Sequence, residues 1–438
     1  MLILIKNGTV IDPASDREGF YDILIDGDRI AKVDADIDKE EICSKAAKEG
    51  KEFRLFDAAG KYVMPGFIDL HVHLREPGFE YKETIKTGAM AAAAGGYTTI
   101  CPMPNTRPAT DNVQMVQLVL EKAAKEAIVH VLPIAAVTIG QAGTEMVNVG
   151  ELKRAGAVAI SEDGKSVMNT ALYEAAMRQA AENDIPVFAH CEEKDLVGHG
   201  VMNAGKKAHE LGLPGISNAV EDIICARDIL LAKETGARLH LCHCSTKDSA
   251  RMLALAKQDG LRVTGEVCPH HFTLTEEDIQ GEDTNYKMNP PLRTAEDVAA
   301  LKEALRDGVM DVISTDHAPH SEEEKTKSFQ DAPFGIVGSE TAFALSFTEL
   351  VKTGILTVRQ LVEKMSVNPA EVLRSDRGCI GEGRIADLVI ADPAAEYTID
   401  KNCFFSKGKN TPFHGRKVSG RVEYTFTAGK LVYDYHSL

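Results

Sequence analysis

A central series of apolar, strand-like runs that alternate with helix-like segments constrains the fold most. Several of these runs are continuous β-branched and apolar stretches, which is typical of parallel strands covered on both faces. Helix-like segments such as residues 115–127 and 295–305 lie between them. Repeated strand–helix units predict an α/β protein built on a (β/α)8 barrel, resembling a TIM barrel. The eight runs are residues 64–70, 97–103, 129–137, 157–161, 187–190, 238–243, 262–267 and 311–314.

A doubly wound open sheet is the alternative architecture for these runs. Polar residues cluster at the C-terminal ends of nearly all of them. A closed barrel places its active site at that end of its strands. The pattern therefore favours the barrel over the open sheet.

The two ends of the chain are strand-like and differ from its centre. Short alternating runs near the N-terminus are separated by Asn7-Gly8 and Asp26-Gly27, which predict hairpin turns. A charged stretch at residues 36–51 has helical composition and is expected to be a surface insertion. We expect a small composite β-sandwich domain from residues 1–62 and 372–438, attached to a barrel of residues 63–371.

Charge and composition exclude several classes of function. The formal net charge of −17 argues against nucleic acid or an anionic membrane surface as a partner. No stretch is long and apolar enough to predict a transmembrane span, and the N-terminus lacks the features of a signal peptide. The 9 cysteines form no CxxC pair, which predicts reduced thiols in a cytoplasmic protein.

Histidines and aspartates recur at the ends of the central runs. His71 and His73 are two residues apart on a strand, so their side chains point to the same side. Barrel closure would bring further ligands to the same rim. A polar network without metal is the alternative, but buried carboxylates without a counter-charge are costly, so a dinuclear zinc site is expected. These further ligands are Asp163, His190, His243 and Asp316.

Some neighbouring residues are expected to be structural. Lys165 lies beyond the end of its strand, so Asp163 is the better candidate to bridge two ions, and Glu162 points the opposite way. Cys242 and Cys244 alternate with the histidine between them, and we expect both thiols to face the outer helices as packing groups. The histidines 130 and 240, within strand runs, are expected to be structural.

Four segments carry a resemblance to a known family. Residues 69–78 (DLHVHLREPG) and 314–320 (STDHAPH), the latter followed by Lys325, resemble the two sequence signatures of the class I dihydroorotases in the amidohydrolase superfamily. Residues 102–106 (PMPNT) and 289–293 (NPPLR) resemble further segments of that family. The resemblance covers essentially the whole chain. It implies the interconversion of N-carbamoyl-L-aspartate and L-dihydroorotate in pyrimidine biosynthesis.

The resemblance also implies roles for individual residues. His71, His73 and Asp316 would hold one Zn²⁺, and His190 and His243 a second, with Asp163 and a hydroxide bridging the two. Asp316 would also be the catalytic residue, taking a proton from the attacking water and delivering it to the ring nitrogen. The implied substrate-binding residues are His73, Arg75, Asn105, Asn289, His320, Phe334 and Gly335.

Substrate choice is expected to follow from charge. Dihydroorotate carries a carboxylate that hydantoin and dihydrouracil lack, and the Arg75 guanidinium can donate two parallel hydrogen bonds to it. A salt bridge from Arg75 to Glu76 or Glu80 is the alternative. Residues 321–338 form a long, polar, glycine-containing loop that is expected to act as a lid.

Other functions and partners stay open at this stage. A hydantoinase or allantoinase would share the barrel but usually carries a lysine bridge and lacks the arginine clamp. A catalytically inactive scaffold that partners aspartate transcarbamoylase is a further alternative, although all six ligand positions are filled. The family also implies a homodimer, and a possible association with aspartate transcarbamoylase.

Overall fold

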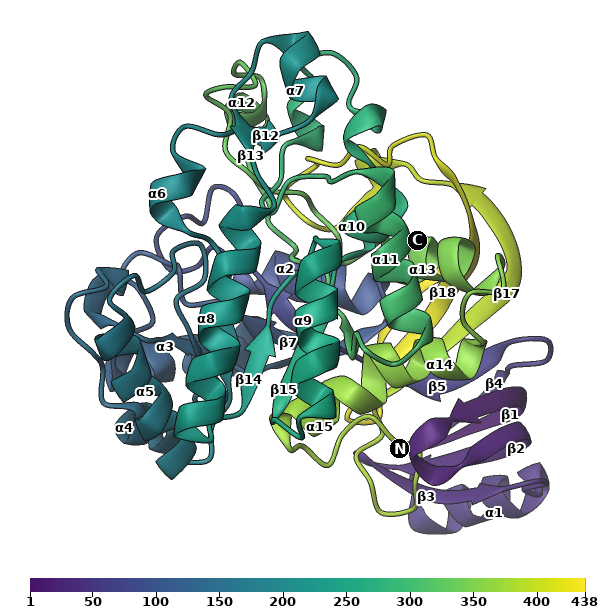
Figure 1. Cartoon of the computed structure of the whole chain (residues 1–438). Helices are drawn as coiled ribbons and strands as arrows, with labels where there is room; N and C mark the ends of the chain where they lie inside the picture. Colours follow the sequence, from purple (N-terminus) through teal and green to yellow (C-terminus); the bar gives the residue numbers. More distant parts are fainter. Residues whose placement is uncertain (438) are drawn as a thin grey trace.

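Strands from both ends of the chain form one sheet in the computed structural model, which describes residues 1–437. The eight strands follow the order β19-β18-β17-β5-β1-β2-β3, with β4 paired to β1. β5 joins the two halves, since it runs parallel to β1 and antiparallel to β17. Figure 1 shows the purple N-terminal strands on the same side of the molecule as β17 and β18. The strands are β1 (Leu2–Asp12), β2 (Arg17–Asp26), β3 (Arg29–Asp34), β4 (Phe53–Asp57), β5 (Tyr62–Pro65), β17 (Leu388–Thr398), β18 (Lys417–Thr427) and β19 (Lys430–Asp434).

The central runs form parallel sheets, as predicted. Three strands pair in the order β6-β7-β8, and six in the order β16-β15-β14-β11-β10-β9. A parallel bridge joins Val72 at the end of β6 to His317 beyond β16, and the backbone N–H of His73 donates to the carbonyl of His317 at 2.8 Å. These strands are β6 (Phe67–Val72), β7 (Tyr97–Pro102), β8 (His130–Val131), β9 (Ile134–Ala136), β10 (Ala159–Ser161), β11 (Val187–Ala189), β14 (Leu239–Leu241), β15 (Val263–Val267) and β16 (Val312–Ile313).

Helices follow most of the central strands, and local sequence sets where they begin. Thr or Asn side chains accept hydrogen bonds from the backbone of the first turn in α2, α3, α4, α5, α9 and α11. Left-handed Gly156 and Gly236 end α4 and α8. These helices are α2 (Ile85–Ala94), α3 (Val113–Glu126), α4 (Val149–Ala155), α5 (Thr170–Glu182), α8 (Ala219–Thr235), α9 (Lys247–Gln258) and α11 (Ala295–Arg306).

Shorter helices and strands lie at the C-terminal ends of the central strands and at the junction with the terminal sheet. Figure 1 shows α6, α7, β12, β13 and α12 together at one end of the molecule. The elements are α6 (Lys194–Val197), β12 (Met202–Asn203), α7 (Lys206–Leu211), β13 (Gly215–Ile216), α10 (Pro269–Thr273), α12 (Glu322–Lys325), α13 (Ala342–Ser346), α14 (Val358–Val362) and α15 (Asn368–Leu373).

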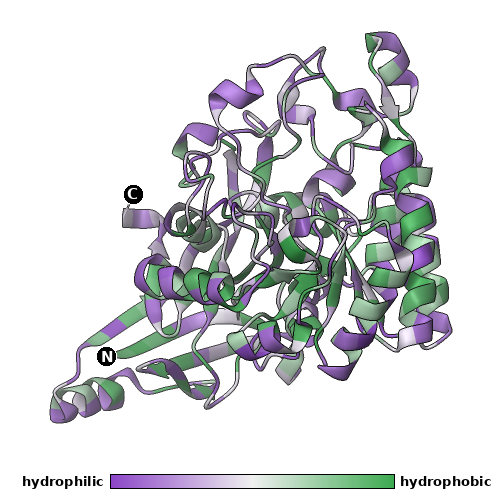
Figure 2. Ribbon diagram, turned by 90° about the vertical axis from the view of Figure 1, so that its left-hand side faces the viewer, coloured by the Kyte–Doolittle hydropathy of each residue, from purple (hydrophilic) through white to green (hydrophobic). Residues whose placement is uncertain are grey.

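The core lies on both sides of the central strands. A large cluster packs the strands against the surrounding helices, and a second cluster takes side chains from nearly every central strand. Figure 2 shows hydrophobic residues concentrated on the strands at the centre and hydrophilic ones on the peripheral loops. The second cluster contains Ile68, Leu70, Cys101, Met103, Ile134, Ala159, Phe188, Cys242 and Val312.

Several local predictions are confirmed and two are wrong. Residues 36–51 contain a helix, α1 (Lys39–Glu49), and Asp26-Gly27 is a hairpin turn. Asn7-Gly8 is not a turn: β1 continues through it, and the register with β2 shifts there because Asn7 adopts a left-handed φ of 64°. The third predicted run is divided into β8 and β9. Within residues 1–437 no helix is both long and apolar enough to cross a membrane.

Candidate metal and substrate site

The end of β6 brings the first two predicted ligands to a common centre, with His71 on the strand and His73 just beyond it. The ring nitrogen Nδ1 of His71 donates to Glu266 Oε1 at 2.7 Å, since an ionised carboxylate only accepts. His73 Nδ1 makes the corresponding bond to Asn105 Oδ1 at 2.9 Å. Both imidazoles therefore turn Nε2, which carries a lone pair in the neutral ring, toward the centre. The Nε2 atom of His71 is buried and has no hydrogen-bond partner among the described residues.

Two aspartates face these lone pairs. Asp163 Oδ1 lies 3.2 Å from Nε2 of His71, and Asp316 Oδ1 lies 3.0 Å from Nε2 of His73. Asp316 Oδ1 is also 3.5 Å from Nε2 of His71. Such a nitrogen faces a carboxylate oxygen favourably at these distances only when a proton or a metal ion lies between them.

His190 and His243 approach the other side of Asp163. Nδ1 of His190 lies 3.5 Å from Asp163 Oδ1 and 2.8 Å from Nε2 of His243. His71, His73 and Asp163 form one group of ligand atoms within 4.8 Å of one another, and Asp163, His190 and His243 form a second. Asp163 therefore belongs to both groups.

The pKa values of the histidines also indicate a site for a cation. Burial lowers the pKa of His71, but Asp163 and Asp316 outweigh this effect and raise it well above its ordinary value. Burial likewise opposes the effect of Asp163 on His190, whose pKa is raised to about 10. Burial, His190 and His71 lower the pKa of His243 to about 3. Protons and metal ions compete for such nitrogens, and the donor set of imidazoles and carboxylates fits a divalent metal ion.

Three residues of the site adopt left-handed backbone conformations. The φ angles are 60° at Arg75, 33° at His243 and 47° at Asp316. This region is costly for residues other than glycine, and such residues cluster at functional sites because the surrounding structure holds them there. The strain coincides with the ends of β6, β14 and β16, where the chain turns its side chains into the centre.

A cavity of about 170 Å³ opens above the centre. A larger cavity of about 390 Å³ lies near the opposite ends of β11, β14, β15 and β16 and contains none of the predicted ligands. The smaller cavity is lined by His73, Arg75, Asn105, Asp163, Gly164, His190, His243, Asn289, Asp316, Ala318, Phe334 and Gly335.

The predicted substrate-binding residues surround this cavity, with one exception. The Arg75 guanidinium is held by a hydrogen bond from Nε to the carbonyl of Pro319 at 3.1 Å. Neither Glu76 nor Glu80 forms a salt bridge with it within the described chain. His320 lies behind Arg75, with Nε2 at 3.2 Å from its guanidinium and 2.8 Å from the carbonyl of Phe334.

Asn105 and the Phe334–Gly335 segment are firmly placed. Asn105 Nδ2 donates to Asp163 Oδ2 at 3.0 Å, so this amide connects His73 with the aspartate shared by the two groups. Gly335 has a φ of 144°, and a Cβ there would lie 2.7 Å from the carbonyl oxygen of Ala318. Only glycine fits this close approach of the loop to the cavity.

The secondary predictions have mixed outcomes. Glu162 accepts from the backbone of Val137 and Thr138, and Lys165 donates to the carbonyl of Gln141, so both are structural as expected. The expectation that Cys242 faces the outer helices is wrong. Its side chain packs in the inner cluster and lies beside His71. Leu239 and Leu241 face the outer cluster and Cys242 continues this alternation, whereas His243, with its left-handed φ, departs from it.

Glu266 is a residue of the site that the sequence analysis missed. It is fully buried and contacts both His71 and His240, with Oε2 at 3.1 Å from Nε2 of His240. The sequence did offer a signal: Glu266 is the only carboxylate in the strand-like run 262–267, and a buried carboxylate needs a hydrogen-bonding or charged partner.

Comparisons with known proteins agree with this geometry. The family model described as Dihydro-orotase-like matches residues 60–249. The dihydroorotase of Caldanaerobacter subterraneus subsp. tengcongensis is 48% identical over 433 residues, covering 99% of this chain and 97% of that protein. The dihydroorotase of Staphylococcus epidermidis is 47% identical over 431 residues, covering 98% and 99%.

Solved structures of hydantoinases share the fold. The L-hydantoinase (dihydropyrimidinase) from Arthrobacter aurescens superimposes with a TM-score of 0.85 at 26% identity, covering 99% of this chain and 96% of that one. The D-hydantoinase (dihydropyrimidinase) from Thermus sp. gives a TM-score of 0.84 at 28% identity, covering 99% and 95%.

Proposed function

The chain belongs to the dihydroorotase family, and from this we propose that it catalyses the reversible cyclisation of N-carbamoyl-L-aspartate to L-dihydroorotate and water in de novo pyrimidine biosynthesis. The observation that carries the proposal is the position of Arg75. Its guanidinium lines the same small cavity as His73, Asp163 and Asp316. A site of that kind binds an anionic substrate directly above a candidate metal centre.

We also propose that the central strands close into a (β/α)8 barrel of residues 63–371. The parallel bridge between Val72 and His317 and the cluster of side chains drawn from nearly every central strand support closure. Residues 1–62 and 372–438 would form the second domain, and their shared sheet supports that grouping.

Two Zn²⁺ ions per subunit are the proposed cofactors. His71, His73 and Asp316 would hold one ion, His190 and His243 the other, and Asp163 would be shared. Bound divalent ions supply Lewis acidity, which polarises an amide carbonyl and lowers the pKa of water. The unpartnered Nε2 atom of His71 and the approach of His190 Nδ1 to Asp163 Oδ1 at 3.5 Å support this assignment.

The substrate would be oriented by its carboxylate and its ring. Arg75 and Asn105 would bind the carboxylate, and Asn289 and the backbone at residues 334–335 would contact the ring. His320 would act on the carboxylate through Arg75, since it lies behind the guanidinium. The loop at residues 321–338 would exclude water during turnover.

Asp316 is the proposed proton carrier. Burial raises its pKa, but His71 and His73 outweigh burial and keep the pKa below its ordinary value, so the group is ionised and able to accept a proton. In hydrolysis Asp316 takes the proton of the attacking water and delivers it to the leaving ring nitrogen. In cyclisation the carbamoyl nitrogen attacks the carbon of the protonated β-carboxyl group, its proton passes through Asp316 to the leaving hydroxyl oxygen, and this oxygen departs as water.

A substrate profile tests the proposal. The purified protein, loaded with zinc, is assayed with dihydroorotate, hydantoin and allantoin in parallel. Turnover of dihydroorotate alone is expected. Turnover of hydantoin or allantoin without dihydroorotate would assign the hydantoinase type of activity, and absence of turnover together with absence of bound metal would assign a non-catalytic scaffold.

Cytoplasmic location, a homodimer and association with aspartate transcarbamoylase remain predictions from the family. Size-exclusion chromatography with light scattering tests the dimer, since a monomeric mass would contradict it.

A further inference from the structure

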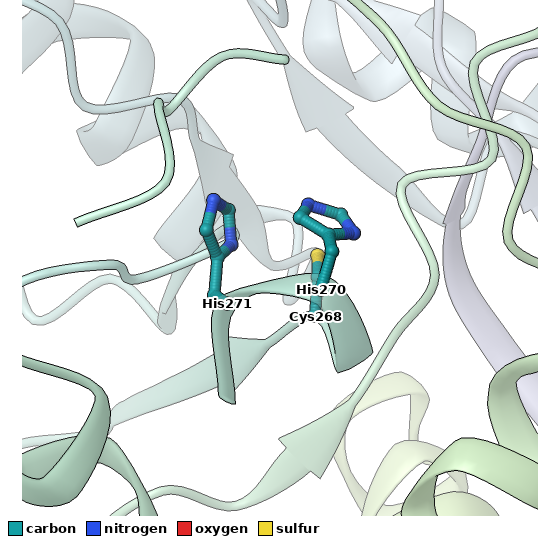
Figure 3. A group of neighbouring side chains, drawn as sticks. All are labelled: Cys268, His270 and His271. Carbon is teal, nitrogen blue, oxygen red and sulfur yellow. The ribbon is translucent and has the colours of Figure 1, made fainter. Parts of the chain in front are cut away.

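A further group of potential metal ligands lies outside the site described above. Cys268 precedes the short helix α10, and His270 and His271 lie within it. One ligand atom from each of the three residues lies within 4.8 Å of the others, and all three side chains are buried. Figure 3 shows both imidazoles rising from the same segment, with the Cys268 sulfur beside His270.

Two nitrogens of this group lack partners. Nε2 of His271 lies 2.9 Å from the carbonyl oxygen of Pro290, and because a carbonyl only accepts, Nε2 carries the hydrogen. Nδ1 of His271 therefore presents a lone pair, and it has no hydrogen-bond partner in residues 1–437. Nε2 of His270 is likewise buried without a partner in that part of the chain. Unsatisfied buried polar atoms are rare and require an explanation.

We propose that Cys268, His270 and His271 form a third metal site, which takes Zn²⁺ or another borderline-soft divalent cation. A thiolate and two imidazoles are ligands that zinc prefers, and a water would fill the fourth position. The donor atoms of a tetrahedral zinc site lie about 3.5 Å apart, as bond lengths of about 2.1 and 2.3 Å require. The ligand atoms lie within 4.8 Å of one another, so binding an ion would draw them together by about 1 Å.

This site differs in chemistry from the candidate catalytic centre. The catalytic ligands are all nitrogen or oxygen, whereas Cys268 adds sulfur. Burial raises the pKa of the Cys268 thiol well above its ordinary value, so the free thiol is protonated. Binding an ion breaks the S–H bond, forms the S–metal bond and releases one proton to the solvent.

The site also adjoins the substrate cavity. His271 holds the carbonyl of Pro290, and the preceding residue, Asn289, lines the cavity. An ion that fixes the His271 ring thus stabilises the segment that carries Asn289. The proposed role is structural, and it does not depend on which ring the enzyme opens.

Cobalt substitution tests the proposal. The full-length protein is stripped with a chelator and titrated with Co²⁺, and the near-ultraviolet charge-transfer band of a thiolate–cobalt bond is recorded. The wild type is expected to show the band. Cys268→Ser is expected to lose it, and Cys101→Ser, which changes a buried thiol outside every candidate group, is expected to keep it.

Two further variants keep the result decisive. Cys242→Ser changes the thiol beside His71, and the cobalt-loaded variant is expected to keep the thiolate–cobalt band. His270→Asn keeps the thiolate and is expected to weaken cobalt binding at this site at least about tenfold. Absence of the band from the wild type, or its loss in Cys242→Ser with retention in Cys268→Ser, would overturn the proposal. Failure of the proposed reaction would show in the substrate assay and would leave this band unchanged.

Discussion

Glu266 Oε1 lies 2.7 Å from Nδ1 of His71, and both side chains are completely buried. Burial raises the pKa of Glu266, but His240 and His71 outweigh burial and lower it well below its ordinary value. The ionised carboxylate fixes the tautomer of His71 and directs its Nε2 lone pair to the candidate metal centre. Carboxylate–histidine pairs of this kind orient metal ligands and increase their basicity.

Glu266→Gln is therefore expected to weaken metal binding by about 10- to 100-fold. The amide keeps the size of the side chain but loses the charge that increases the basicity of His71. Competition with a chromogenic chelator measures the zinc affinity. Glu340→Gln, which changes a half-buried carboxylate outside the site, is the matched control and should bind zinc as the wild type does. Equal affinity in Glu266→Gln and the wild type would contradict the role of this pair.

Asp316→Asn is expected to lower kcat for dihydroorotate by about 100- to 10,000-fold, because the amide cannot accept the proton. Metal content is measured on the same sample, since Asp316 is also a proposed ligand. A protein that keeps its metal and retains kcat within a few-fold would show that another group carries the proton.

Arg75→Lys is expected to reduce kcat/KM for dihydroorotate by about 10- to 100-fold, mainly through a higher KM. A lysine keeps the charge but cannot form two parallel hydrogen bonds to a carboxylate. Steady-state kinetics measure the effect, with the exposed Arg306→Lys as the control. Unchanged kcat/KM in Arg75→Lys would remove this arginine from the substrate site.

Much of the site follows from the sequence, because strand ends and strand alternation are local properties. His71 on β6 and His73 just beyond its end point to the same side, and the remaining ligands follow strand ends that parallel pairing brings to one edge. Alternation fails where a strand ends. β14 ends at residue 241 and His243 adopts a left-handed φ, so His243 and Cys242 both point inward, and counting alternation from His243 gave the wrong side for Cys242.

Other features depend on contacts between distant segments. The partnership of Glu266 with His71 joins residues 195 positions apart, and only the folded chain brings them together. The position of His320 behind Arg75 likewise depends on a contact between residues far apart in the sequence. Asn7-Gly8 illustrates a local ambiguity, since the same pair suits a hairpin turn and a bulge within a strand.

Glu340 provides a prediction on pH. Burial raises its pKa to about 7, although the backbone N–H groups of Phe405 and Ser406 donate to it. Between the unfolded value of 4.5 and about 7 the folded state binds more protons, so this group's contribution to stability falls as the pH rises.

The Glu340→Gln variant lacks this titration. Urea unfolding from about pH 5 to about pH 8 is expected to show the wild type losing stability relative to the variant as the pH rises. A difference in midpoint that stays constant over this range would show that the pKa of Glu340 is not raised.

The central claim, that this site selects a ring bearing a carboxylate, is tested most directly by comparing kcat/KM for dihydroorotate and dihydrouracil in the zinc-loaded wild type. The two rings differ in the carboxylate that Arg75 is proposed to bind. We predict that dihydroorotate is preferred by about 10,000-fold or more, as expected where loss of a substrate group leaves buried polar groups unpaired. Comparable values for the two substrates, or a preference for dihydrouracil, would contradict the account.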